Sequence, residues 1–180
     1  MRILKEKSAG IIVDVQERLM PHIYENSTTI KNLKTLIEGL NILEIPLLVS
    51  QQYTKGLGGT VKDVSDSIGD FTPMEKMTFS CCDEEYFMKK IKDLEKEFFI
   101  IAGIETHVCV LQTSLDLLEK GYKVVLVEDC VSSRRENDKN MAVQRLRAHG
   151  AIITTYESLL FELCRYAGTE EFKKISKLVK

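Results

Sequence analysis

The sequence alternates six short apolar runs with segments whose apolar residues repeat at helical spacing. The apolar runs span residues 9–15, 45–50, 74–79, 97–103, 123–129 and 151–155. Runs that are apolar throughout, rather than at every second residue, are typical of strands buried on both faces, and such strands form parallel sheets. The helical patterns span residues 27–44, 83–92, 106–120, 137–149, 157–166 and 169–178. The sequence therefore predicts a Rossmann-like α/β fold of three layers, with a six-stranded parallel sheet between two layers of helices.

The chain has the length of one domain. Its 180 residues contain no internal repeat and no linker-like stretch, so residues 1–180 are predicted to form a single domain. One connection is unusually long: residues 51–72 are rich in Gly, Ser, Asp and Lys and show no strong pattern. Because most connections in compact domains are shorter than about 12 residues, this segment is a candidate functional loop.

Composition and cysteine usage narrow the classes of partner and cofactor. The net charge of −2 gives no support for nucleic-acid binding. No apolar stretch approaches the ~20 residues that a membrane span requires. The five cysteines show no CxxC spacing and the three histidines are scattered, so neither a metal site nor a cofactor is predicted. Reduced thiols of this kind are typical of a cytoplasmic protein.

Three chemically different side chains are predicted to meet at one edge of the sheet. Asp14 ends the first strand, Lys76 lies in the third, and Cys109 follows the fourth. Ligands of open α/β sheets bind beyond the carboxyl ends of the strands, which makes this edge the place for a site. Each charged residue alone has a simpler interpretation, as a helix cap for Asp14 and as a solvent-reaching side chain for Lys76. Together, each supplies the countercharge that the other needs.

The position of Cys109 suggests a reactive thiol. With Thr106 as the N-cap, the thiol falls in the first turn of a helix, where free amides and the helix dipole favour negative charge and lower a thiol pKa. The alternative is an inert buried thiol, which is the interpretation for Cys130 and Cys164. A nucleophile with a nearby base, and backbone amides placed to stabilise an oxyanion, would suit covalent acyl transfer.

Several stretches resemble the isochorismatase-like cysteine hydrolases over essentially the whole chain. They are "IIVDVQ", "EKMTFSC", "AGIETHVCVLQTSLDLLEKGYKV", "EDCVSSR" and "GAIITTYES". The resemblance implies the isochorismatase-like hydrolase fold and a role for each residue of the triad. Asp14 would be the general base, Lys76 would lower the thiol pKa and hold the charge of the intermediate, and Cys109 would attack a carbonyl to form a thioester that water hydrolyses.

The resemblance carries further expectations and one departure. It implies a cis peptide between Ile104 and Glu105, and an oxyanion hole formed by the amides of Glu105 and Cys109. It also implies a homo-oligomer. Nicotinamidases of this family bind a metal through histidines after the second strand, but "SQQYTKGLGG" contains none. The cysteine favours C–N hydrolysis over cleavage of a vinyl ether, which related enzymes perform without it.

Further polar residues are candidates for the substrate pocket. Gln16, Gln52 and Tyr53 lie near the predicted edge, and His107 either lines the pocket or faces solvent. The sequence thus predicts a cofactor-independent cysteine hydrolase that cleaves a small amide-type substrate. The alternatives are a catalytically idle interaction protein that retains the fold, and a vinyl-ether hydrolase of the isochorismate type. The identity of the small-molecule substrate depends on a few loop residues, which the fold does not specify.

Overall fold

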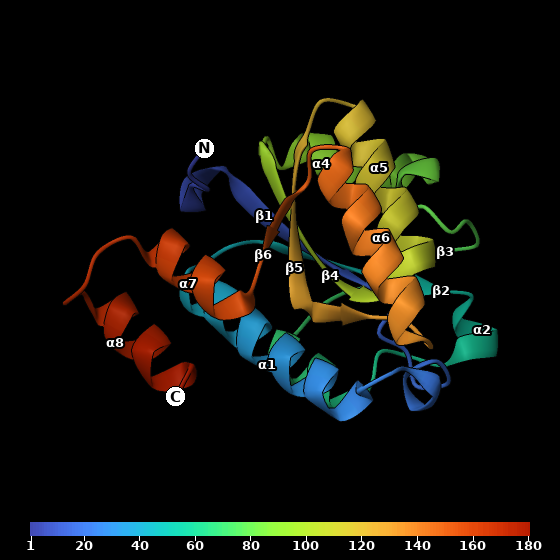
Figure 1. Cartoon of the computed structure of the whole chain (residues 1–180), viewed down its shortest axis with the longest axis horizontal. Coiled ribbons are helices and arrows are strands. Elements are labelled where there is room, and N and C mark those ends of the chain that lie inside the picture. Colours follow the sequence, from blue (N-terminus) through green and yellow to red (C-terminus); the bar gives the residue numbers. More distant parts are fainter.

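The computed structural model describes all 180 residues, and a single parallel sheet runs through its centre (Figure 1). Its strands are β1 (Ser8–Val13), β2 (Leu47–Gln52), β3 (Met74–Lys76), β4 (Phe98–Ile104), β5 (Lys123–Ser132) and β6 (Ile152–Thr154). They lie in the order β3-β2-β1-β4-β5-β6, and every neighbouring pair is parallel. The predicted six-stranded parallel sheet and the α/β class are confirmed.

Helices cover both faces of the sheet, as Figure 1 shows. One face carries α1 (Asn26–Ile42), α3 (Lys62–Ile68), α7 (Tyr156–Cys164) and α8 (Glu170–Leu178). The other carries α4 (Glu85–Asp93), α5 (Leu111–Glu119) and α6 (Glu136–Ala148). Strand residues alternate between the two cores: Ile12 packs toward the α1 layer, and Ile11 and Val13 pack toward the α5 layer. Because both faces are buried, the central strands are apolar throughout.

Short helical pieces complete the chain. They are the 3-10 turns Lys5–Lys7, Met20–His22 and Cys81–Asp83, the four-residue helix α2 (Thr54–Leu57), and a π-helical turn at Thr106–Val110. The π-helical turn leads directly into α5, so Cys109 lies just before the regular part of that helix. No helix combines the length and the apolar character that crossing a lipid bilayer requires.

The segment 51–72 differs from its prediction as a loop. It contains the end of β2 and the two helices α2 and α3. Val64 of α3 is fully buried, and Val61 and Ile68 pack beside it against the core under α1. These short helices were missed because seven residues or fewer make too few turns for an apolar period to show. The third strand is also shorter than predicted, ending at Lys76 rather than residue 79.

The central strands β1 and β4 set the location of the site. After β1 the chain crosses to α1 on one face of the sheet, and after β4 it crosses to α5 on the other. This change of direction opens a crevice at the carboxyl ends of the two strands. Gly103 permits their close approach: its φ is +119°, and a Cβ there would lie 2.1 Å from the carbonyl oxygen of Val13.

Candidate functional site

A buried ion pair lies at the carboxyl edge of the sheet. Asp14 directly follows β1 with a positive φ of 49°, an unusual backbone conformation that sets the direction of its side chain. Its Oδ2 lies 2.7 Å from Nζ of Lys76, and both side chains are at most 1% exposed. The hydroxyl of Ser50, near the carboxyl end of β2, donates to Oδ1 of Asp14 at 2.7 Å. Three neighbouring strands therefore place the two charges together.

Lys76 uses all the donors of its ammonium group. Nζ donates to Oε1 of Gln52 at 2.6 Å and to the carbonyl oxygens of Thr78 and Phe79 at 3.0 Å each, so its contact with Oδ2 of Asp14 is an ion pair rather than a fourth hydrogen bond. Burial by itself lowers the pKa of Lys76, but the negative charge of Asp14 opposes this, and the pKa lies above its ordinary value. The lysine is therefore a fixed cation. The two carbonyl oxygens that accept from Nζ belong to the turn that directly follows β3.

Cys109 lies against the same cluster. Cys109 is only 8% exposed. Its Sγ lies 3.8 Å from Oε1 of Gln52, the atom that also accepts a hydrogen bond from Lys76. Burial and then the charge of Asp14 raise the thiol pKa well above its ordinary value, and a hydrogen bond to Asp14 adds to the rise, while Lys76 opposes it. The structure thus brings the three residues together: Gln52 joins Lys76 to Cys109, and Lys76 pairs with Asp14.

Two predictions about this thiol are wrong. We expected its pKa to be lowered, but the raised pKa leaves the resting thiol protonated because desolvation and Asp14 outweigh Lys76. We also expected Thr106 to cap the helix, but Glu105 is the N-cap residue and no side chain caps this turn. The hydroxyl of Thr106 is instead buried without a hydrogen-bond partner.

The strand-to-helix passage before Cys109 has an unusual backbone. The peptide bond between Ile104 and Glu105 is cis. The amide N–H of Glu105 donates to no acceptor within the chain. The side chain of Glu105 turns to Arg134, whose backbone N and Nε donate to Oε2 at 3.0 and 3.1 Å. A free backbone donor therefore lies four residues before the thiol.

Comparison with known proteins supports the assignment of the chain to a family. Residues 8–158 match the isochorismatase domain model. The chain belongs to the isochorismatase family. It is similar to the secreted isochorismatase effector Isc1 of Phytophthora sojae (strain P6497), with 39% identity over 183 residues, covering 99% of this chain and 87% of that protein.

Solved structures of the family have the same fold. The protein solved as MAR1 ribonuclease from Caenorhabditis elegans superposes with a TM-score of 0.93 at 37% identity, covering 99% of this chain and 92% of that one. The YcaC gene product of Escherichia coli, described as an octameric hydrolase of unknown specificity, gives a TM-score of 0.92 at 24% identity, covering 99% of this chain and 90% of that one. At that identity the likeness to YcaC shows the fold alone.

Gln16 was predicted to line the substrate pocket, but in this isochorismatase-family chain its side chain joins backbone segments inside the protein. Its side chain is fully buried, and Nε2 donates to the carbonyl oxygens of Gln52 and Gly58 at 2.9 and 2.7 Å. Its Oε1 accepts from the backbone N of Gln52 at 2.7 Å. Because both amide hydrogens are used inside the chain, Gln16 has no donor left for a substrate. It acts by holding the backbone of Gln52 in place.

The other predicted pocket residues occupy different positions. Gln52 joins Lys76 to Cys109 through Oε1, as described above, so it belongs to the centre of the site. Tyr53 is 45% exposed at the rim, and its backbone N donates to the carbonyl oxygen of Lys76. His107 is half-buried, with Nδ1 2.9 Å from the hydroxyl of Ser133, and it lines a small pocket beside α6 that contains none of the triad.

Sequence reasoning missed Ser50 and the pairing of Glu105 with Arg134. Ser50 could have been found, because it is a polar residue near the carboxyl end of β2. Asp14 is predicted to lie at the same edge of the sheet. The Glu105–Arg134 pair joins the ends of β4 and β5 and has no signal in the sequence. No group of three His, Cys, Asp or Glu side chains lies close enough to hold a metal ion.

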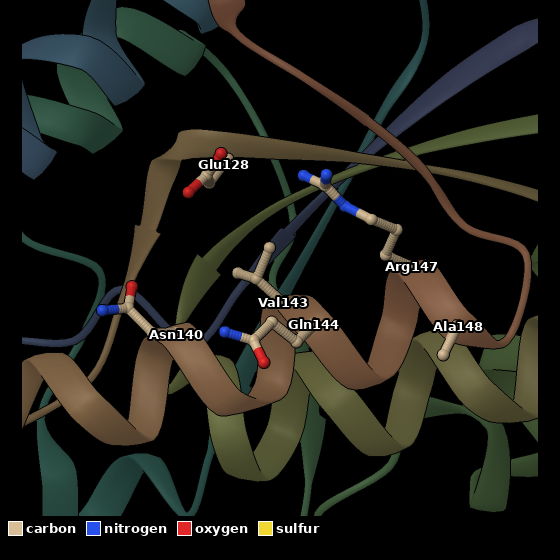
Figure 2. Close-up of a pocket in the computed structure, with 6 residues that line it drawn as sticks. All are labelled: Glu128, Asn140, Val143, Gln144, Arg147 and Ala148. Atoms are coloured by element: carbon tan, nitrogen blue, oxygen red, sulfur yellow. The ribbon is translucent and has the colours of Figure 1, made fainter.

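A large surface pocket lies away from these residues. Figure 2 shows it between α6, which supplies Asn140, Gln144 and Arg147, and the bend of β5 that carries Glu128. Its volume is about 480 Å³, and none of the triad residues lines it. The buried Asp14–Lys76–Cys109 cluster is therefore the candidate active site.

Proposed function

We propose that the chain is a cysteine hydrolase that cleaves the C–N bond of a small amide-type substrate through a thioester on Cys109. The observation that carries this proposal is that a thiol and an ammonium meet at one amide oxygen and the ammonium also pairs with a carboxylate, all three groups being nearly excluded from water. A nucleophile with an adjacent base is suited to covalent acyl transfer, and a fixed cation can balance the negative charge that develops.

In the first half of the reaction, Asp14 takes the proton of the Cys109 thiol as sulfur attacks the carbonyl carbon. The raised thiol pKa suits this order, because the thiolate forms only when a substrate is there to receive it. The negative charge that develops on the carbonyl oxygen is stabilised by the amides of Glu105 and Cys109, the first of which has no acceptor of its own. Asp14 then gives its proton to the leaving nitrogen as the C–N bond breaks.

In the second half, water attacks the thioester. Asp14 takes a proton from the water, the C–S bond breaks, and the sulfur recovers a proton while the carboxylic acid leaves. Lys76 stays charged throughout, because its raised pKa keeps it protonated at neutral pH. It balances the negative charge that moves among Asp14, the thiolate and the oxyanion.

Burial of the triad favours a small substrate. Asp14, Lys76 and Cys109 are 0%, 2% and 8% exposed. A site this enclosed suits a small molecule better than a polynucleotide, so RNA cleavage, the activity named for the C. elegans neighbour, is not the function proposed here. Cytoplasmic location and a homo-oligomeric state stay predictions; the relative from P. sojae is described as secreted.

The test is ammonia release from a panel of small primary amides and ureides, measured for the wild type and for Cys109→Ser. Cys164→Ser is the matched control, because Cys164 is 7% exposed against 8% for Cys109 and lies in α7, away from the triad. Release that is lost in Cys109→Ser and kept in Cys164→Ser is expected. Release that persists in Cys109→Ser refutes the thioester, and turnover of vinyl ethers alone supports the alternative hydrolase.

A further inference from the structure

A second cavity lies on the same edge of the sheet as the triad. Its volume is about 400 Å³, and it is formed by the chain that follows three strands. The segment after β1 supplies Leu19, His22 and Ile23, the residue after β4 is Glu105, and the loop after β5 supplies Arg134. No triad residue lines it, but Glu105 belongs to both regions, because its backbone N–H lies in the proposed oxyanion hole.

The carboxylate of Glu105 is only half used. Both of the hydrogen bonds it receives, from the backbone N and Nε of Arg134, end on Oε2. Oε1 accepts no hydrogen bond, although the side chain is only 11% exposed. Oε1 is not fully buried and keeps some surface accessible to solvent. A nearly buried carboxylate oxygen with accessible surface and no donor favours a ligand that donates to it.

The rest of the lining supplies the complementary chemistry. Arg134 uses Nε for Glu105, and its terminal nitrogens make no hydrogen bond within the chain, so the guanidinium can donate to an acceptor. Leu19 and Ile23 are apolar, and Ile23 is only 4% exposed. The cavity therefore presents an acceptor and a donor side by side, next to an apolar wall.

We propose that this cavity binds a carboxamide. The NH₂ group would donate to Oε1 of Glu105, the amide oxygen would accept from the Arg134 guanidinium, and the apolar part of the molecule would lie on Leu19 and Ile23. A carboxylate places negative charge against Glu105, and an ammonium places positive charge against Arg134, so each charged analogue meets a repulsion that the neutral amide avoids. The inference goes beyond the proposed function and does not depend on it, because binding in this cavity does not require Cys109.

The experiment is an NMR titration of the full chain with three probes of the same shape: isobutyramide, isobutyrate and isobutylamine. The signals followed are the methyl groups of Ile23 and the Nε–H of Arg134, which its hydrogen bond to Glu105 protects. Isobutyramide is expected to shift both signals with a dissociation constant on the order of 1–10 mM. Each charged analogue is expected to bind at least fivefold more weakly.

Variants test the two polar partners separately. In Glu105→Gln, the side-chain oxygen of the new glutamine accepts from Arg134, so its NH₂ group takes the place of Oε1. The cavity then has no acceptor for the NH₂ group of isobutyramide, and binding is expected to fall at least fivefold. Glu128→Gln is the matched control, since it makes the same change in the pocket of Figure 2 and should leave binding unchanged. If Glu105→Gln fails to fold, Arg134→Ala is used instead, because a side chain that is 63% exposed is expected to be dispensable for folding; isobutyramide binding, followed at the Ile23 methyl groups, should again fall at least fivefold.

Three results would overturn the proposal: equal affinity for all three probes, no shift of either signal at 100 mM isobutyramide, or an equal loss in Glu128→Gln. The same titration on Cys109→Ser separates this inference from the proposed function. Unchanged binding there is expected. If Cys109 proves unreactive while isobutyramide still binds, the hydrolase proposal fails and the carboxamide site stands.

Discussion

Replacing Asp14, the proposed general base, is expected to make Cys109 more reactive toward an alkylating reagent, although it would abolish the proposed hydrolysis. Asp14 raises the pKa of the Cys109 thiol, second only to burial, whereas Lys76 lowers it. Asp14→Asn removes the negative charge and keeps the shape of the side chain. The thiol pKa should therefore fall, and more thiolate should exist at neutral pH without substrate. A residue that merely packs in the core would show no such effect.

The expected size follows from the charges. A like charge within about 4–6 Å shifts a pKa by roughly 1–3 units, and we take about 1–2 units because Lys76 already balances part of the charge of Asp14. Each unit raises the thiolate fraction about tenfold but lowers its intrinsic nucleophilicity about threefold. The net increase in the alkylation rate is then about 3- to 11-fold. Lys76→Ala should change the rate in the opposite direction.

The assay is iodoacetamide labelling at pH 7.5, with the modified peptides quantified by mass spectrometry and folding checked by circular dichroism. Cys164 is the internal control in every sample, because its exposure matches that of Cys109. The reasoning is refuted if folded Asp14→Asn labels Cys109 no faster than the wild type. It is also refuted if Cys164 speeds up by the same factor.

Three further predictions concern stability. Gly103→Ala should lower the free energy of unfolding by more than about 4 kcal/mol or prevent folding, because its Cβ would meet Val13 backbone atoms at 2.1–2.9 Å. Gly69→Ala is the control: Gly69 also has a positive φ but open space around it, so the loss should be about 1 kcal/mol. Urea unfolding compares the two variants. Burial raises the pKa of Cys82 from 9.0 to about 12, so between pH 9 and 12 only the unfolded thiol ionises. The free energy of unfolding should therefore fall over this range, by up to about 1.4 kcal/mol per pH unit for Cys82 alone. Urea titrations at several pH values should show that Cys82→Ala removes this part of the pH dependence. Gln16→Leu should lower the free energy of unfolding by about 2–4 kcal/mol, because three backbone groups lose their hydrogen-bond partner. If Gln16→Leu and the exposed control Gln144→Leu had the same melting temperature, the structural role of Gln16 would be contradicted.

The strands and the positions of the triad could be predicted because each depends on local sequence. A strand buried on both faces must be apolar throughout, so β1, β4 and β5 are visible as runs. Asp14 and Cys109 follow such runs directly, and the rule for open sheets then brings them to one edge. The resemblance to a family supplied the roles, which the residues alone left open.

The features that were missed depend on distances between segments far apart in the chain. The thiol pKa was predicted with the wrong sign because the start of a helix is visible in sequence, whereas the depth of the thiol and its proximity to Asp14 are not. Gln16 was taken for a pocket residue because its position at the edge is visible, but its bonds to Gln52 and Gly58 are not. Residues 51–72 were taken for a loop because α2 and α3 are too short to show a period.

The most direct test of the central claim is to map the acyl group left by p-nitrophenyl acetate, an activated ester that reports a thioester-forming site without knowledge of the substrate. Peptide mass spectrometry would be run on the wild type, Cys109→Ser and Lys76→Ala. The account predicts a hydroxylamine-sensitive acetyl group on Cys109 in the wild type, much less in Lys76→Ala, and none on Cys164. Acetylation spread evenly over the five cysteines, or absent from Cys109, would contradict it.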